Sequence, residues 1–160
     1  MSVFYLGSSI IERCDFGENN LGKGGLKSSD LMSYYKGVSL KGRIVVLYIG
    51  SNDIRANNID EKTIYTNIVN FIESIEKDVK KIIYVAILKE PLTKNEIAIN
   101  YVNNKMREYE RISKKVLYVN INKNVKNKEK YFLEDKVHLN EEGKAIFVRK
   151  IREVIEKEKK

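Results

Sequence analysis

The sequence predicts a three-layer α/β/α sandwich around a five-stranded parallel sheet with the flavodoxin-like strand order 2-1-3-4-5. Two observations lead to this fold class. Four short runs are apolar throughout and rich in β-branched residues, and segments with helical periodicity lie between them. Continuously apolar strands are typical of parallel sheets that helices cover on both faces. Strands that alternate with helices form right-handed crossovers, so we expect the strands to be parallel.

The four apolar runs predict the long strands of this sheet. They span residues 3–6, 44–49, 82–88 and 116–121. They do not alternate between apolar and polar residues, as a strand with one face in water would, so we expect them to be buried. A weaker run near Phe16 to Leu21 predicts a fifth, short strand, so that the second strand of the chain lies at one edge.

Three segments predict amphipathic helices. They span residues 61–79, 95–112 and 140–157. In the first two, apolar side chains recur along one face of a helix, at Ile64, Ile68, Phe71, Ile72 and Ile75 and at Ile99, Val102, Met106 and Tyr109. The third opens with Asn140, which suits a helix start, and is expected to bury Ile146, Ile151 and Ile155.

The composition favours one domain over residues 1–160, because 160 residues with 42% hydrophobic content make one sizeable core. The single cysteine, Cys14, excludes an internal disulfide and a site with several cysteine ligands, which fits a reducing compartment. The first residues lack a basic leader, and no later run reaches the length of a membrane span. We therefore expect a cytoplasmic protein.

The net charge of +8 does not favour a nucleic-acid partner, because the 30 basic residues are interleaved with 22 acidic ones. Most of the ten tyrosines that could stack on bases lie within apolar runs, where core packing is the expected role. We expect no nucleic-acid partner.

The turn after the first strand can present a nucleophile. Gly7-Ser8-Ser9-Ile10 places a hydroxyl at the start of a helix. In the functional interpretation, Ser9 attacks an acyl group and its own N–H faces the bound carbonyl. An ordinary serine N-cap and an anion-binding turn for phosphate are the alternatives that these residues leave open.

Two further loops follow predicted strands. Gly22, Gly24 and Gly25 lie close together in the second loop, where backbone N–H groups can approach a ligand, although a flexible surface turn is the plain alternative. Lys23 precedes the last two glycines, so this is not a Walker loop. In Gly50-Ser51-Asn52-Asp53, the amide of Asn52 can face a developing oxyanion or form an Asx-turn.

His138 is the only histidine of the chain, and it follows Asp135 by three residues just before the last predicted helix. A carboxylate at this spacing can fix the tautomer of the imidazole and steady its cation, while an ordinary solvated pair is the alternative. The four motifs follow one another in order, each at the carboxyl end of a predicted strand or in the final loop. Their conjunction favours one shared site.

Taken together, these motifs resemble those of the SGNH hydrolases, also called GDSL esterases and lipases, over nearly the whole chain. The resemblance implies that Ser9 is the nucleophile and that Asp135 and His138 complete a catalytic triad. It also implies an oxyanion hole formed by the N–H groups of Ser9 and Gly25 and the side chain of Asn52. Gly24 is the alternative to Gly25, and Gly143 stands where the last block of the family usually carries a glycine.

The family resemblance further implies a serine esterase that hydrolyses a carboxylic ester with a short acyl group, acetyl or similar, with a carbohydrate as one option for the alcohol. The partner would be a small-molecule or carbohydrate ester, and no cofactor or metal is expected. A lysophospholipase or thioesterase of the same family is one alternative. A non-catalytic domain that binds an anion or a carbohydrate on the same fold is the other.

The sequence departs from the family pattern at Ser8, which replaces an aspartate and changes how the turn of the nucleophile is braced. The chain is also short for the family, which predicts an open, shallow cleft. Three polar loops would form its walls, at residues 55–60, 89–94 and 122–131. We expect most of their polar side chains, among them Glu90, to face solvent.

Overall fold

A parallel sheet of four strands lies at the centre of the computed structural model, which describes residues 2–93 and 95–159. The strands lie in the order β1 (Val3–Gly7), β2 (Ile44–Tyr48), β3 (Lys81–Val85) and β4 (Val116–Val119). Each pairs in parallel with the next. Met1 and Lys160, the ends of the predicted domain, and Lys94, the end of a predicted loop, lie outside the described residues.

The fifth strand predicted near Phe16 to Leu21 is reduced to a single parallel bridge between Tyr5 and Asn20. The segment lies beside β1, where the predicted order places it, but the expected count of five strands is wrong. The side chain of Asn20 donates to the carbonyl oxygens of Ile11 at 2.7 Å and Cys14 at 3.0 Å. These local bonds favour a loop over a longer ladder.

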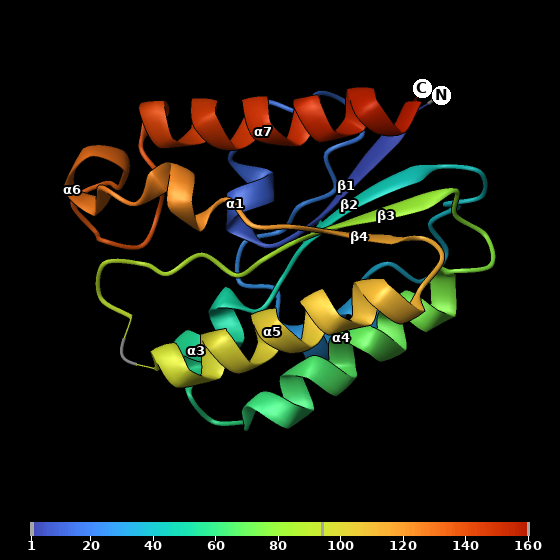
Figure 1. Ribbon diagram of the computed structural model, residues 1–160, viewed down its shortest axis with the longest axis horizontal. Helices are drawn as coiled ribbons and strands as arrows, with labels where there is room; N and C mark the ends of the chain where they lie inside the picture. The colour runs from blue at the N-terminus through green and yellow to red at the C-terminus, as the bar shows by residue number, and fades with distance from the viewer. Residues whose placement is uncertain (1, 94, 160) are drawn as a thin grey trace.

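Helices cover both faces of the sheet (Figure 1): α7 lies along one face, and α4 and α5 lie along the other. The three long helices are α4 (Glu61–Ile75), α5 (Glu96–Ile112) and α7 (Glu141–Lys159). The short ones are α1 (Ser9–Glu12), η1 (Ser28–Asp30), α2 (Leu31–Tyr34), α3 (Ser51–Ala56), η2 (Asn122–Val125) and α6 (Lys128–Tyr131). No helix in the described part of the chain has the length and apolar character needed to cross a membrane.

Side-chain oxygens fix where the long helices begin. Asp60 accepts from the N–H of Thr63 at 2.8 Å, and Asn95 accepts from Ala98 at 3.1 Å. Asn140, the predicted start of the last helix, accepts from the N–H of Gly143 at 2.9 Å. Each bond satisfies an N–H group that the first turn of a helix leaves without a partner.

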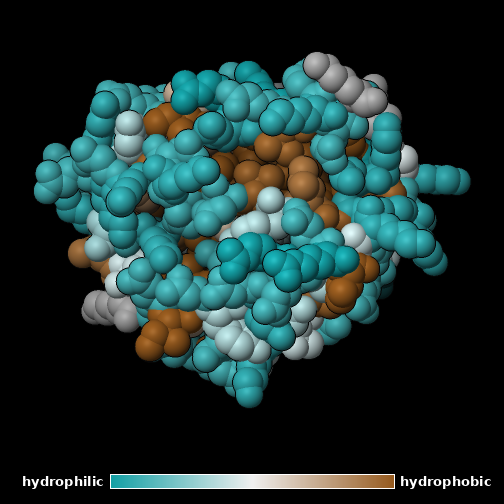
Figure 2. All heavy atoms as spheres, viewed as in Figure 1, coloured by the Kyte–Doolittle hydropathy of each residue, from teal (hydrophilic) through white to brown (hydrophobic). Residues whose placement is uncertain are grey.

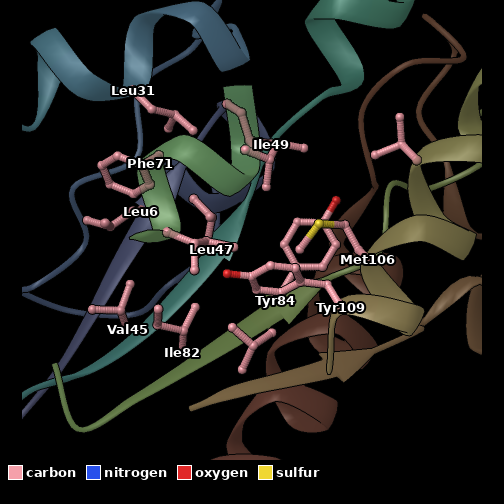
Figure 3. Close-up of a cluster of buried hydrophobic side chains, with 14 of the residues drawn as sticks. Leu6, Leu31, Val45, Leu47, Ile49, Phe71, Ile82, Tyr84, Met106 and Tyr109 are labelled. Atoms are coloured by element: carbon pink, nitrogen blue, oxygen red, sulfur yellow. The ribbon is translucent and has the colours of Figure 1, made fainter. Parts of the chain in front are cut away.

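As their continuous apolar runs predict, β1, β2 and β3 are almost wholly buried. In β4, at the edge of the sheet, only Val116 is buried and the other three residues are half-buried, so the expected burial is wrong there. On one face the core contains Leu6, Val45, Leu47, Ile82 and Tyr84, packed with α4 and α5 (Figure 3). On the other face it contains Val46, Ile83, Val85 and, from α7, Phe147 and Ile151. Burying one such side chain contributes roughly 1.5–3 kcal/mol, so both layers are needed to hold the sheet.

The outer edge of β4 is occupied by side chains of the chain itself. Glu110, on α5, accepts from the N–H of Tyr118 at 2.7 Å, and the hydroxyl of Ser113 accepts from the N–H of Val116 at 3.2 Å. Figure 2 shows mainly hydrophilic side chains on this face of the molecule, with hydrophobic ones visible in a hollow between α7 and the sheet.

Candidate active site

The turn after β1 presents Ser9 at the carboxyl end of the sheet. Gly7 has φ +138°, and a Cβ there would lie 1.9 Å from the carbonyl oxygen of Tyr48, so only glycine fits. Ser8 is buried, and its carbonyl accepts from the N–H groups of Ile11 and Glu12. The residue that replaces the family's aspartate thus braces the turn through its backbone. Ser9 itself is half-buried and opens α1.

The glycine loop lies against the start of α1. A Cβ on Gly22 would lie 2.4 Å from the backbone nitrogen of Glu12, so the loop approaches the helix closely. The N–H of Gly24 donates to Oε1 of Glu12 at 3.0 Å. A Cβ on Gly24 would lie 3.9 Å from the Cβ of Ser9, so this loop borders the candidate nucleophile. The N–H of Gly25 makes no hydrogen bond within residues 2–93 and 95–159.

Asn52 lies on the first turn of α3, directly after β2. Its Nδ2 donates to the carbonyl oxygen of Leu26 at 2.9 Å, and its Oδ1 accepts from Nη2 of Arg55. The amide therefore borders the end of the glycine loop. The structure brings together two motifs that are separate in the sequence.

The buried carboxylate of Asp53 ties the same two loops together. It accepts from the N–H of Ser28 at 2.9 Å and from its hydroxyl at 2.8 Å. Burial raises the pKa of Asp53, and the two bonds from Ser28 act in the opposite direction. Asp53 therefore fixes how the glycine loop and α3 lie relative to each other.

Asp135 and His138 form a direct pair in the loop before α7. Oδ2 of Asp135 lies 2.6 Å from Nδ1 of His138, and Oδ1 accepts from the N–H groups of Val137 at 2.9 Å and His138 at 3.0 Å. Bonds from the imidazole and these N–H groups hold the pKa of Asp135 well below its usual range. Because a carboxylate only accepts, Nδ1 carries a proton and Nε2 is free to act as a base.

The hydroxyl of Ser9 is not hydrogen-bonded to His138 in the described part of the chain. Hydrogen bonds of this kind are often long in the absence of a substrate. Each of the other candidate residues contacts another part of the site: Asp135 contacts His138, Asn52 contacts the glycine loop, and this loop borders Ser9.

Two residues of the site were not predicted as functional. Glu90 was expected to face solvent, but its side chain is only 13% exposed and pairs with Arg55. Tyr35 holds the end of β1, since its hydroxyl accepts from the N–H of Gly7 at 2.8 Å and donates to Leu21 at 2.8 Å. The only sign for Glu90 in the sequence is its position two residues after the predicted strand at 82–88. No local pattern marks Tyr35.

A cavity of about 560 Å³ adjoins the site. Ser51 and Val137, the neighbours of Asn52 and His138 in the sequence, line it together with Arg55 and Glu90. Ile54, Ile87, Leu88 and Ile99 supply its apolar part. The cavity therefore borders the candidate residues through the sequence neighbours of Asn52 and His138. Within residues 2–93 and 95–159, no three or more His, Cys, Asp or Glu side chains gather as a metal site would require.

Most of the chain matches a known protein family. Residues 4–146 match the model of the GDSL-like Lipase/Acylhydrolase family. Comparison with curated protein sequences gives no significant match.

Solved structures share the fold. A GDSL-like lipase from Bacteroides thetaiotaomicron gives a TM-score of 0.79 at 25% identity, over 97% of this chain and 87% of that one. A member of the lipolytic G-D-S-L family from Veillonella parvula gives 0.75 at 20% identity, over 95% and 96%. A catalytic mutant of an acetylxylan esterase from Geobacillus stearothermophilus gives 0.77 at 15% identity, over 93% and 91%. These structures confirm the predicted α/β fold around a parallel sheet, which has four strands here.

Proposed function

Because the chain belongs to the GDSL-like lipase/acylhydrolase family, we propose that it is a serine esterase that forms an acyl-enzyme on Ser9. The substrate is a carboxylic ester with a short acyl group, acetyl or similar. The observation that carries the proposal is the 2.6 Å contact between Asp135 and His138, the only histidine of the chain. This pair supplies a general base with a fixed tautomer, which is what a serine nucleophile requires.

The reaction begins when Oγ of Ser9 attacks the ester carbonyl carbon. Nε2 of His138 takes the proton of the hydroxyl, while Asp135 keeps the proton on Nδ1 and stabilises the imidazolium without accepting that proton. The tetrahedral intermediate then collapses, the bond to the alcohol breaks, and His138 protonates the leaving oxygen. Water, deprotonated by His138, releases the acyl group from Ser9 in the second half of the reaction.

The oxyanion of the intermediate accepts from the N–H groups of Ser9 and Gly25 and from Nδ2 of Asn52. Gly25 is favoured over Gly24, because the N–H of Gly24 already donates to Glu12. Losing one such donor typically lowers turnover by about 10²-fold to 10³-fold.

A carbohydrate is the alcohol component of the ester that we favour. An acetylxylan esterase shares the fold over most of both chains, although at 15% identity it supports only this choice of substrates to test first. The apolar part of the cavity favours a second candidate, a lysophospholipase or thioesterase, because Ile54, Ile87 and Ile99 could accommodate a longer acyl chain.

Covalent labelling by a fluorophosphonate tests the enzyme reading against a non-catalytic binding domain. We expect wild-type protein to be labelled at Ser9 and Ser9→Ala to stay unlabelled. Ser74→Ala, which removes a hydroxyl bonded to Phe71 on α4, is the matched control and should label normally. An unlabelled wild-type protein would contradict the proposal. A panel of esters that vary in acyl length and alcohol then separates the candidate substrates.

A further inference from the structure

Arg55 connects the proposed oxyanion donor to a largely buried carboxylate on another loop. Its Nη2 donates to Oδ1 of Asn52, which lies three residues earlier on α3. Its Nη1 donates to Oε1 of Glu90, in the segment that follows β3. The side chain of Arg55 is 33% exposed and that of Glu90 is 13% exposed. The guanidinium is therefore engaged on two sides, and little water reaches its partner carboxylate.

The guanidinium determines which way the Asn52 amide points. A carboxamide has an acceptor oxygen on one side and a donor NH₂ group on the other, whereas a guanidinium only donates. With Oδ1 against Arg55, Nδ2 faces the glycine loop, where one of its hydrogens bonds to Leu26 at 2.9 Å. The second hydrogen remains available for an oxyanion. The flipped amide would set two donors against each other.

Glu90 in turn holds Arg55 in place. Within residues 2–93 and 95–159, the carboxylate of Glu90 forms its ion pair with Arg55 and with no other cation. Lys128 approaches only the carbonyl oxygen of Glu90, at 3.5 Å. Burial raises the pKa of Glu90, and the guanidinium of Arg55 acts against this rise, so the pair favours the ionised carboxylate.

We propose that Arg55 is a positioning residue, which keeps Nδ2 of Asn52 directed at the oxyanion hole while Glu90 fixes the guanidinium. This inference rests on the proposed function, because it acts through the oxyanion donor that the esterase reading assigns. Arg55 itself needs no contact with the substrate in this role. Lysine cannot replace it, since only the planar guanidinium reaches two acceptors in fixed directions at once.

The test measures kcat and KM of Arg55→Met and Arg55→Lys on a short-chain nitrophenyl ester, in the wild type and in Asn52→Ala. We expect Arg55→Met to lower kcat roughly tenfold with KM changed by less than about twofold, because a transition-state contact is disordered. We expect Arg55→Lys to restore less than half of that loss. In the Asn52→Ala background, Arg55→Met should change kcat by less than about twofold, because its target is gone.

Two further variants separate positioning from general damage to the fold. Lys81 begins β3, at the end of the strand away from the site, and its side chain is 30% exposed, similar to that of Arg55. Its Nζ pairs with Oε1 of Glu158 at 3.1 Å. Lys81→Met should leave kcat unchanged. In Arg55→Met the carboxylate of Glu90 is left unpaired, and adding Glu90→Gln removes that charge. The double variant should therefore regain the melting temperature that Arg55→Met loses, but its kcat should stay low.

Four outcomes would overturn the inference. A loss of kcat that is as large in Asn52→Ala as in the wild type would mean that Arg55 acts elsewhere. A loss confined to KM would make Arg55 a substrate contact. Normal turnover in Asn52→Ala itself would overturn the proposed oxyanion role, and the inference with it, whereas normal turnover in Arg55→Met alone would overturn only the inference.

Discussion

The buried hydroxyl of Tyr48 accepts a hydrogen bond from the N–H of Leu88 at 3.0 Å. It also lies 2.7 Å from the hydroxyl of Ser51, at the start of α3. One side chain therefore links the start of α3, the helix that carries Asn52, to the segment that leads to Glu90. By contrast, the hydroxyl of Tyr84, which lies near Met106 and Tyr109 in the opposite layer (Figure 3), has no partner within residues 2–93 and 95–159.

The two tyrosines should respond oppositely to loss of the hydroxyl. Tyr48→Phe leaves the N–H of Leu88 buried without an acceptor, so we expect the free energy of unfolding to fall by about 1–3 kcal/mol. Tyr84→Phe removes a hydroxyl that burial strips of hydrogen bonds, so we expect no loss, or a gain of up to about 1 kcal/mol. Urea denaturation of both variants measures the difference. Equal destabilisation would indicate that Tyr84 has an acceptor.

Asp53 should make stability depend on pH in a recognisable direction. Its pKa is raised by burial above the ordinary value of 3.8, so the folded protein binds this proton more tightly than the unfolded chain. The stability that the group contributes is complete below the unfolded-state pKa and is lost as pH rises through the folded-state pKa.

The melting temperature of Asp53→Asn should therefore rise relative to that of the wild type between about pH 3 and about pH 7, where the wild type must ionise a buried group. The pKa of Asp135 is lowered, so its contribution runs the other way, but it is common to both proteins and cancels in the comparison. Scanning calorimetry at several pH values checks the difference. If the melting temperature of Asp53→Asn minus that of the wild type stays constant or falls as pH rises, this interpretation is wrong.

Removing the nucleophile or the base should abolish esterase activity while the protein stays folded. For Ser9→Ala and His138→Ala we expect turnover of a nitrophenyl ester to fall by at least about 10³-fold, because no second histidine can act as the base. Far-ultraviolet circular dichroism should match the wild type, since Ser9 and His138 are not core residues. Either variant working at a normal rate would show that the reaction uses other groups.

Asp135→Asn tests whether this carboxylate orients the imidazole. An asparagine can present a donor to Nδ1 and so favour the wrong tautomer, which typically lowers kcat by about 10³-fold to 10⁴-fold. Glu134→Gln, a similar change at the preceding exposed residue, is the control and should keep its activity. Parallel losses in the two variants would mean that general charge near the site matters more than the pairing with His138.

The apolar runs predicted the fold well because burial on both faces leaves a local trace. Residues 44–49 and 82–88 are predicted as strands. β2 (44–48) lies within the first range, and β3 (81–85) overlaps the first part of the second. The strand near Asn20 was wrong because its side chain bonds locally to Ile11 and Cys14, a choice that apolar content does not reveal.

The candidate site was predictable where each motif follows a strand, since parallel strands end at one edge of the sheet. The pairing of Arg55 with Glu90 was not predictable, because it joins residues 35 positions apart whose charges look like those of any solvated loop. Ion pairs of this kind depend on how two loops meet in space, and sequence periodicity carries no signal for that.

The hydrogen bond from Tyr118 to Glu110 has a consequence for the crowded conditions of synthesis and storage. An open strand edge is a template on which a second chain can add a strand, and such additions propagate into aggregates. With one outward N–H taken by Glu110 and another by Ser113, an approaching strand must displace a carboxylate and a hydroxyl before it can pair. Helix α5 thus provides the β4 edge with its own protection against intermolecular aggregation.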